Sequence, residues 1–381
     1  MRLSRRPVGP VLRTTAFCVG VLALAACAER WVQGPVGVTA HDPAANALTT
    51  LECTATVKTG VVSCRTPSAS TGGAHGDFVG GQNVYTKLTS SNVSYNGGTE
   101  IFQFDVTVQN LMKEAIGTPD GTIPGVNGIR VFFANGPTAT SGTGTITVAN
   151  ADGTGTFTGI NQPYFQYNNI LAQNAVSPVK TWQLNVPSTV NTFAFTVYLY
   201  TDIQPLIVIN ELLANPGGTI SDANGEWVEL YNAGTRQVNL QGFFIADSAA
   251  SGRRPYAMIN DTLSSLVIQP GGYFVIGNTK NTTNNGGVPV DYAYGATMAF
   301  ANSLDAFKLA RVYGTDTLTI DRTQYASAAI SAQNGISREL KNALLDNSNM
   351  DGSNWVDASV SSVYGPGGRG TPKAQNSGFT P

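Results

Sequence analysis

The amino-acid sequence predicts an all-β protein built from two β-sandwich domains. Short runs of apolar and β-branched residues are separated by turns rich in Gly, Pro and Asn, and the 381 residues include 42 Gly and 19 Pro. Several runs place an apolar residue at every second position, as strands with one buried face do. No window of about 11 residues carries a helical apolar stripe. The length suits two domains, each able to bury its own core.

Residues 1–26 have the pattern of a secretory signal peptide. Four arginines precede an apolar run at residues 17–26 that is too short to span a bilayer; they are Arg2, Arg5, Arg6 and Arg13. The residues at the end of this run, Leu24, Ala25, Ala26 and Cys27, resemble the lipobox of bacterial lipoproteins. The alternative is an ordinary signal peptide cut near Ala26, with no lipid attached.

The lipobox resemblance implies a place in the cell. In bacterial lipoproteins the cysteine, here Cys27, becomes the lipid-bearing first residue and holds the protein at a membrane surface. The residue that follows it helps to decide sorting, and Ala28 is not the aspartate that commonly retains lipoproteins in the inner membrane. We therefore expect a lipid-anchored protein of the bacterial cell envelope, at the outer membrane or cell surface.

Residues 27–77 are predicted to form a lipid-anchored tether that contains one short hairpin. Most of this stretch is rich in Pro, Ala, Thr, Ser and Gly. Two short strands around Lys58, Thr59 and Gly60 would bring Cys53 and Cys64 opposite each other, so we expect a disulfide in an oxidising compartment. A two-thiolate metal site is the alternative, but zinc normally takes four ligands.

Charge argues against one class of partner. The chain has 22 basic and 24 acidic residues, which leaves no excess of positive charge to neutralise phosphates. Removal of the four signal-peptide arginines would make the exported part more acidic still. Nucleic-acid binding through net charge is therefore not expected.

Residues 78–203 are predicted to form the first β-sandwich. In the run 102–109, Phe102, Phe104, Val106 and Val108 alternate with polar residues, and Phe193, Phe195, Val197 and Leu199 do the same in the run 192–201. Further strands are expected at 83–88, 129–134 and 182–186. The pair Asp152-Gly153 predicts a hairpin turn inside the run 144–159.

Residues 205–376 are predicted to form the second β-sandwich, followed by a short tail at 377–381. The runs IVINELL (207–213) and EWVELY (226–231) flank a turn-rich connection. The same pattern continues through the segments 238–247, 266–277, 304–314 and 336–340, then Trp355 and YGPGGRGTPKAQN at 364–376. In order and character these segments resemble the lamin-tail domain family. The resemblance implies an immunoglobulin-like β-sandwich of the kind found in bacterial surface and secreted proteins.

Few residues offer catalytic or metal chemistry. His41 and His75 are the two histidines, and both precede the first clear domain on presumed loops. The Asx-rich run 346–354 has the opening spacing of an EF-hand loop but no glutamate at its twelfth position, and an Asx turn explains it better. We therefore expect a protein that is not an enzyme, with no catalytic residues, no metal site and no cofactor.

A cluster of acids and aromatics is the strongest candidate for a ligand surface. Glu211, Glu226 and Glu229 lie in the 207–232 segment, and paired carboxylates can hydrolyse glycosidic bonds. Trp227, Glu229 and Tyr231 share one face of their strand and could form a sugar or peptide platform. The alternative is that these rings fill the sandwich core or its rim, as the lamin-tail resemblance favours.

Long polar loops are the other candidate for binding. The loops at 249–260 and 278–296 carry Arg253, Arg254 and Lys280, and such loops on a rigid sandwich often bind partners. The sequence thus favours a non-enzymatic surface lipoprotein whose sandwiches serve adhesion, envelope structure or contacts with a protein or cell-envelope partner. The alternatives are an accessory binding module for an exported hydrolase or nuclease, and a carbohydrate-binding surface protein.

Overall fold

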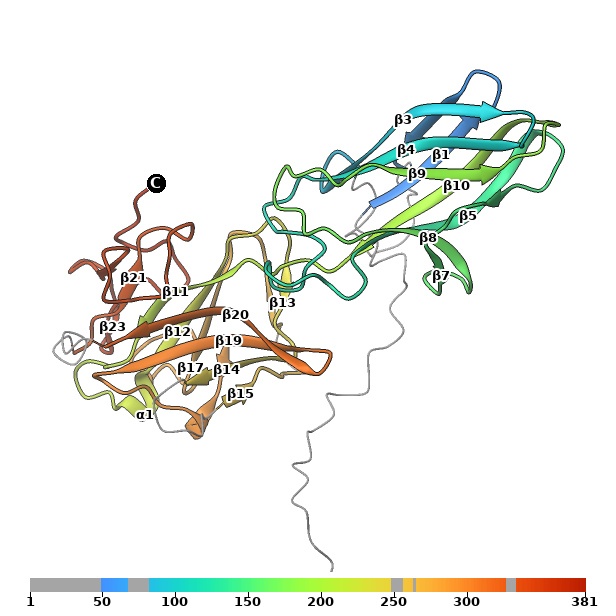
Figure 1. The fold of residues 1–381 in the computed structure, drawn as a ribbon. Coiled ribbons are helices and arrows are strands. Elements are labelled where there is room, and N and C mark those ends of the chain that lie inside the picture. The colour runs from blue at the N-terminus through green and yellow to red at the C-terminus, as the bar shows by residue number, and fades with distance from the viewer. Residues whose placement is uncertain (1–48, 68–81, 248–255, 263–264, 327–333) are drawn as a thin grey trace, which may run out of the picture. The chain divides into compact units, whose positions relative to one another are not determined.

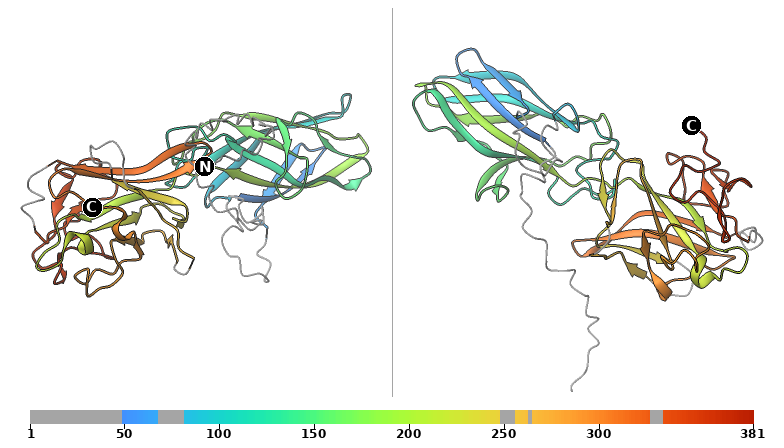
Figure 2. Two further views of the ribbon diagram at one scale, coloured as in Figure 1. Left: turned by 90° about the horizontal axis from the view of Figure 1, so that it is seen from below. Right: turned by 180° about the vertical axis from the view of Figure 1, so that it is seen from behind.

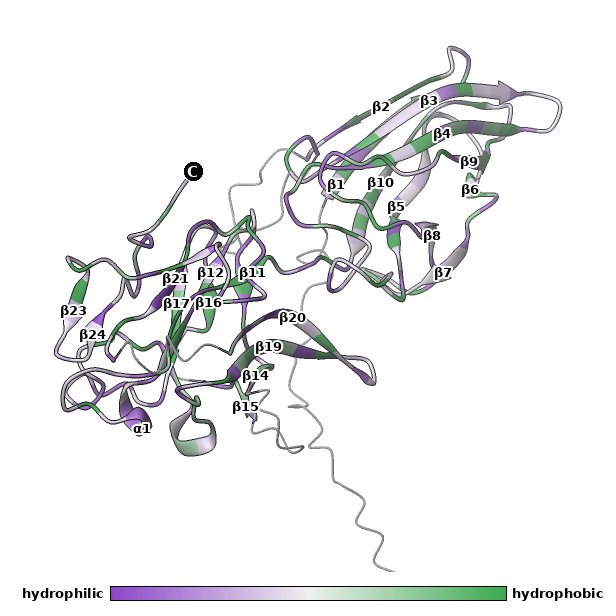
Figure 3. Ribbon diagram, turned by 60° about the vertical axis from the view of Figure 1, so that its left-hand side comes forward, coloured by the Kyte–Doolittle hydropathy of each residue, from purple (hydrophilic) through white to green (hydrophobic). Residues whose placement is uncertain are grey.

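Alternating burial along single strands builds the first β-sandwich. In the computed structural model, which describes residues 49–67, 82–247, 256–262, 265–326 and 334–381, strand β4 (Ile101–Asn110) buries every second residue. Strand β10 (Val190–Thr201) does the same with the predicted residues Phe193, Phe195, Val197 and Leu199. Figure 3 shows this alternation as bands of contrasting hydropathy along β4. The two strands predicted from the period of two are confirmed.

Two antiparallel sheets face each other in this sandwich. One has the order β2-β1-β10-β5-β8-β7 and the other the order β3-β4-β9-β6, and both can be followed in Figure 1. The strands not yet given are β1 (Thr49–Thr56), β2 (Val61–Arg65), β3 (Thr86–Asn96), β5 (Ile129–Gly142), β6 (Thr147–Val148), β7 (Gly153–Gly155), β8 (Gln162–Tyr167) and β9 (Lys180–Asn185).

Aromatic rings fill the space between the two sheets. Trp182 stacks on Phe165 with ring centroids 4.6 Å apart, and it also contacts Phe104 and Phe133. These side chains come from β9, β8, β4 and β5, so the core joins both layers. Burial of several such rings supplies much of the free energy that holds the sheets together.

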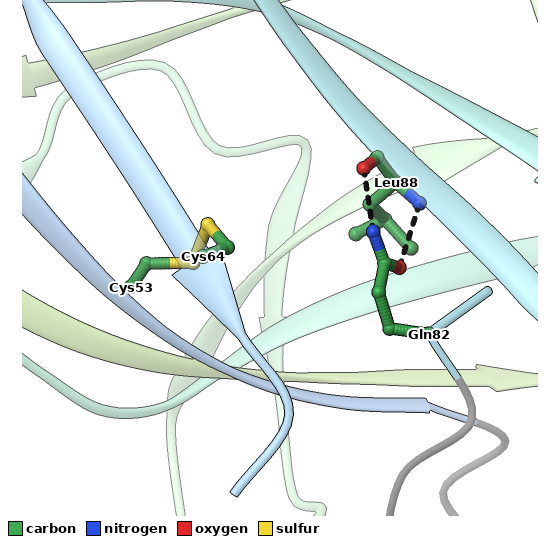
Figure 4. Close-up of a disulfide and its surroundings, with 4 residues drawn as sticks. All are labelled: Cys53, Cys64, Gln82 and Leu88. Carbon is green, nitrogen blue, oxygen red and sulfur yellow. Dashed lines mark hydrogen bonds between the residues drawn. A yellow bond between two sulfur atoms is a disulfide. The ribbon is translucent and has the colours of Figure 1, made fainter.

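The disulfide hairpin belongs to this sandwich and not to a tether. Strand β1 pairs with β10 along its whole length, and Cys53 lies opposite Cys64 of β2 with their Cα atoms 4.0 Å apart. Figure 4 shows the bond between them, beside the hydrogen-bonded pair Gln82 and Leu88. The predicted turn and disulfide are confirmed, and Gly60 adopts the left-handed φ of 61° at the turn.

The predicted boundary at residue 78 is therefore wrong for the hairpin. Leu51, Cys53 and Ala55 point into the core of the first sandwich, so β1 is one of its interior strands. Only one face of β1 needs apolar residues, so the sequence around the hairpin has low hydrophobicity. For this reason the place of β1 in the core was not predicted. Residues 1–48 and 68–77, with the predicted signal peptide, Cys27, His41 and His75, lie outside the described residues.

The turn predicted at Asp152-Gly153 also differs. Strand β6 pairs with β9 and strand β7 pairs with β8, so the strands on either side of this turn enter different sheets. The Asp152 carboxylate instead accepts hydrogen bonds from the Gln166 backbone N–H at 2.7 Å and from Lys180 Nζ. The Asp-Gly pair is typical of a local turn, but here the Asp152 side chain bonds to residues that are distant in sequence.

The second β-sandwich follows the predicted runs closely. Its larger sheet has the order β18-β17-β12-β11-β21-β22 and its smaller one the order β15-β14-β19-β20. The larger sheet contains β11 (Ile207–Leu213), β12 (Trp227–Asn232), β17 (Tyr273–Gly277), β18 (Tyr292–Ala293), β21 (Arg338–Leu340) and β22 (Trp355–Asp357). The smaller contains β14 (Phe243–Asp247), β15 (Tyr256–Met258), β19 (Asp305–Tyr313) and β20 (Asp316–Tyr325).

Two short strand pairs and two short helical turns complete the described part. The pairs are β13 (Val238–Asn239) with β16 (Val267–Ile268) and β23 (Val363–Gly365) with β24 (Gly368–Arg369). Helix α1 (Asp222–Gly225) ends the connection between β11 and β12, and the 3-10 turn η2 spans Gly295–Thr297. Figure 2 shows the ribbon from two further directions. Within the described ranges no helix has the length and apolar character needed to cross a membrane.

Candidate functional site

The predicted acid and aromatic surface lies mostly inside the protein. Trp227 and Glu229 are both fully buried, whereas Tyr231 is half-buried and packs on Tyr273 with ring centroids 5.0 Å apart. Trp227 and Glu229 were therefore wrongly predicted as part of a ligand surface. Arg253 and Arg254 lie outside the described residues.

Trp227 fills a small core on the outer face of the larger sheet. It packs with Leu213, Val275 and Val288, and its ring meets Tyr364 edge to face at 5.9 Å. Val228 and Leu230 point to the opposite face, into the main core between the sheets. The predicted division of β12 into two faces is correct, but both faces are covered. The alternative weighed from the sequence, that the ring fills the core, is confirmed.

Three glutamates form a buried row beside this small core. Glu211 of β11 lies opposite Glu229 of β12 on one side and Glu339 of β21 on the other. Cross-strand partners point to the same face of a sheet, so the three carboxyls are neighbours. None of the three is exposed. Burial of carboxyl groups is costly unless each finds hydrogen-bond donors, and we call this set the glutamate row.

The C-terminal segment, which we define as residues 371–378, supplies those donors. Glu211 accepts hydrogen bonds from Thr371 N at 2.9 Å and from Ser337 Oγ at 2.5 Å. Glu229 accepts one from Lys373 N at 2.6 Å. Glu339 accepts one from Ser377 Oγ at 2.7 Å and another from Gly378 N at 3.0 Å. The glutamate row thus fastens the C-terminal segment across the sheet.

Two asparagines and a glycine extend the same network. Asn376 donates to the carbonyls of Asn210 at 3.0 Å and Leu340 at 2.8 Å, and Asn210 donates to Glu229 Oε1 at 2.9 Å. Gly370 begins the crossing because a Cβ at this position would lie 2.6 Å from Glu211 Oε1. The segment therefore approaches the carboxyls as closely as a backbone can.

Burial changes the acidity of the row. Burial, and the charge of Glu229 beside it, raise the pKa of Glu211 well above its usual range. Burial also raises the pKa of Glu229 to about 8, although hydrogen bonds from Lys373 and Asn210 and the charge of Lys373 oppose the rise. The row can therefore hold protons near neutral pH, at a place that the C-terminal segment closes.

The raised pKa of Glu229 predicts a pH dependence of stability. The folded state binds this proton more tightly than the unfolded state, whose pKa is near 4.5. Stability is therefore greatest below pH 4.5 for this group and falls as the pH rises through 8, by about 2 kcal/mol between pH 6 and 8. The side chain at position 229 cannot titrate in Glu229→Gln. We therefore expect the difference in free energy of unfolding between this variant and wild type to shift in favour of the variant by about 2 kcal/mol from pH 6 to pH 8.

Denaturant unfolding at pH 6, 7 and 8 measures that difference. Glu100→Gln is the matched control, because Glu100 is fully exposed and a hydrogen bond from Ser188 lowers its pKa. Its profile should run parallel to wild type between pH 6 and 8. Parallel profiles for wild type and Glu229→Gln would contradict the prediction.

Sequence reasoning found only part of this network. It grouped Glu211, Glu226 and Glu229, and the structure brings the first and third together. Glu226 points to the opposite face, next to the main core. The sequence missed the roles of Glu339, Asn210 and Asn376, although all three lie inside predicted segments, at 336–340, 207–213 and 364–376. In the described part of the chain, no three or more His, Cys, Asp or Glu side chains are placed to hold a metal ion.

The fold and this network define an immunoglobulin-like β-sandwich whose C-terminal segment is fastened across one sheet. Residues 204–351 match the family model of the Lamin Tail Domain, which confirms the resemblance found in the sequence. The strands β22 to β24 and the C-terminal segment lie beyond the matched residues, although the segment bonds to Glu211 and Glu229 within them.

The similarity of this chain to a solved structure is weak. A crystal structure of a DUF4876 family protein from Bacteroides thetaiotaomicron VPI-5482 is similar over 88% of this chain and 95% of that chain, with 10% sequence identity and a TM-score of 0.29. A likeness this distant carries no argument about function. No curated protein matches the chain.

Proposed function

We propose that this is a non-enzymatic, lipid-anchored protein of the bacterial cell envelope whose β-sandwiches contact a protein or envelope partner. The observation that carries the proposal is the state of the glutamate row. Two of the three carboxylates that the sequence offered for hydrolysis, Glu211 and Glu229, belong to this row, and both are buried and bonded to the protein's own chain. The glutamate row therefore supports a structural role for these carboxylates.

The disulfide supports the exported location. Cys53 and Cys64 are bonded inside the first sandwich, and such bonds persist in oxidising compartments outside the cytosol. The signal-peptide pattern and the lipobox at residues 24–27 point the same way. A lipid on Cys27 would hold both sandwiches at a membrane surface.

An exposed edge strand supports a partner surface, because residues 256–258 of the predicted loop 249–260 form strand β15. Strand β15 pairs with β14 and forms an edge of the smaller sheet. Its Tyr256 is 63% exposed and its Met258 is 40% exposed. Exposed rings and thioethers at a sheet edge are common where proteins bind each other. The burial of Trp227 argues against the carbohydrate platform.

Fractionation and intact-mass analysis of the exported protein test the anchor. We expect a chain that begins at Cys27, carries acyl groups, lacks the two hydrogens of a free Cys53 and Cys64 pair, and sediments with membranes. The variant Cys27→Ser should lose the acyl mass and leave the membrane fraction. A chain cut elsewhere without a lipid would overturn the anchored location.

Cross-linking on intact cells tests the partner. We expect covalent links from Lys280 and its neighbours in the loop 278–296 to an envelope protein, reduced by Tyr256→Ala. Tyr95→Ala, in β3 of the first sandwich, is the control that should leave these links unchanged. A hydrolase or nuclease as the linked partner would favour the accessory-module alternative. No specific link at all would contradict a protein-binding role.

A further inference from the structure

Three polar side chains lie side by side at one end of the larger sheet. Trp227 pairs with Gly277, and Gly277 pairs with Ala293. The next residues in this register are Glu226, Asn278 and Tyr294, and backbone bonds from Asn278 N to Glu226 O and from Tyr294 N to Gly277 O hold them there. All three are almost fully buried, with exposures of 1%, 5% and 5%.

Each of these side chains has an oxygen without a hydrogen-bond partner. They are Glu226 Oε1, Asn278 Oδ1 and Tyr294 Oη. The other carboxyl oxygen, Glu226 Oε2, accepts from Phe300 N at 3.0 Å. The Asn278 amide lies close enough to the Glu226 carboxyl to lower its pKa, yet Oε1 gains no bond of good geometry.

A fourth unpartnered oxygen comes from the loop after Phe300. Asn302 donates its amide N–H to Asp222 Oδ2 at 3.1 Å, and its Oδ1 has no partner. Helix α1 brings Asp222 close to Glu226, and Glu226 N donates to Asp222 O at 3.5 Å. Among the described buried side-chain atoms that lack a partner, Glu226 Oε1, Asn278 Oδ1, Asn302 Oδ1 and Tyr294 Oη therefore form one group, which we call the oxygen cluster.

The oxygen cluster has more acceptors than donors, because the Tyr294 hydroxyl can donate and the amide and carboxylate oxygens accept. Buried polar atoms are nearly always bonded, so several unbonded ones in one place require a cause. Every atom in this group is an oxygen, and two carboxylates lie within it or at its rim.

We propose that the oxygen cluster binds a divalent cation of the calcium class. Glu226, Asn278 and Asn302 would supply carboxylate and amide oxygens, and Asp222 would balance charge from the exposed rim. Calcium takes six to eight oxygen ligands and readily completes its shell with water. Sites in extracellular modules bind it at about 0.1 to 1 mM, a range that matches two carboxylates and neutral amides.

This site could not be predicted from the sequence. Its ligands come from three separate segments: the end of the 215–226 connection, the end of β17 and the loop before β19. Bound there, a cation would tie the larger sheet to the chain that enters the smaller one. The inference does not rest on the proposed function, because a cation site in this sandwich is independent of any lipid anchor or partner.

Terbium luminescence on the purified full chain tests the site. Terbium replaces calcium at oxygen sites, and Tyr294 would sensitise its emission. We expect a saturable signal that calcium displaces. Glu226→Gln should weaken terbium binding at least about tenfold, since ligand charge sets affinity. Asp351→Asn, in the exposed Asx-rich turn at 346–354, is the matched control and should bind as wild type.

Stability provides a second readout that guards against misfolded variants. Calcium at a few times its dissociation constant should raise the melting temperature of wild type and of Asp351→Asn, but not of Glu226→Gln. Asp222→Asn, which changes an exposed side chain, should fold normally and bind more weakly. No saturable signal, or equal affinity in Glu226→Gln and wild type, would overturn the proposal. The oxygens would then be satisfied by water and a protonated Glu226.

Discussion

A chain that ends at Gly370 is expected to lose the folded state of its second β-sandwich. This truncation removes the donors from Thr371, Lys373, Ser377 and Gly378 to the glutamate row, together with the Asn376 amide. Each buried carboxyl left without its donor costs about 1 to 3 kcal/mol. Three such losses total about 3 to 9 kcal/mol, which is comparable with the whole stability of many domains.

Denaturant unfolding followed by tryptophan fluorescence measures this loss, because Trp227 and Trp355 report on the second sandwich. A chain that ends at Gly378 is the matched control. It keeps every donor to the glutamate row and loses Phe379, Thr380 and Pro381, of which Thr380 makes two backbone contacts at the surface, with Lys341 and Asn342. We expect a loss of at most about 1 kcal/mol from it. Equal stability of the two truncations would show that the C-terminal segment is not fastened by the row.

The strands of this protein could be predicted because their signal is local. Alternation in 102–108 and 193–199, and the runs 207–213 and 226–231, each specify a strand with a buried face without reference to the rest of the chain. The match to the Lamin Tail Domain confirms the resemblance that the order of these runs suggested. Strand β20 was not predicted. It pairs with β19 along its length, and this pairing explains its burial better than the pattern of its own residues does.

The contents of the candidate site could not be predicted, because they depend on register and on closure. The face shared by Trp227 and Glu229 was predicted correctly. Whether that face is open or covered depends on residues distant in sequence, with Val288 and Tyr364 packed on Trp227 and Lys373 bonded to Glu229. Likewise, Glu211 and Glu339 become neighbours only when β11 pairs with β21. A sequence pattern shows which residues share a face, and it is silent about the segment that covers the face.

Trp227→Ala separates a core residue from a binding residue. The ring is fully buried among Leu213, Val275 and Val288, with Tyr364 at its edge, so its removal leaves a large cavity. We expect the free energy of unfolding of the second sandwich to fall by about 3 to 5 kcal/mol. Trp227→Phe should recover part of this loss, because a smaller ring still fills most of the space.

The matched comparison is Tyr231→Ala, because Tyr231 lies on the same face of β12 as Trp227, four positions later in the sequence. Tyr231 is only half-buried beside Tyr273, so its removal should cost on the order of 1 kcal/mol. Thermal and denaturant unfolding of the three variants give the order directly. If Trp227 instead formed part of a sugar or peptide platform, Trp227→Ala would leave stability nearly unchanged and abolish ligand binding. A loss of stability at Trp227 that is no larger than at Tyr231 would contradict the assignment of Trp227 to the core.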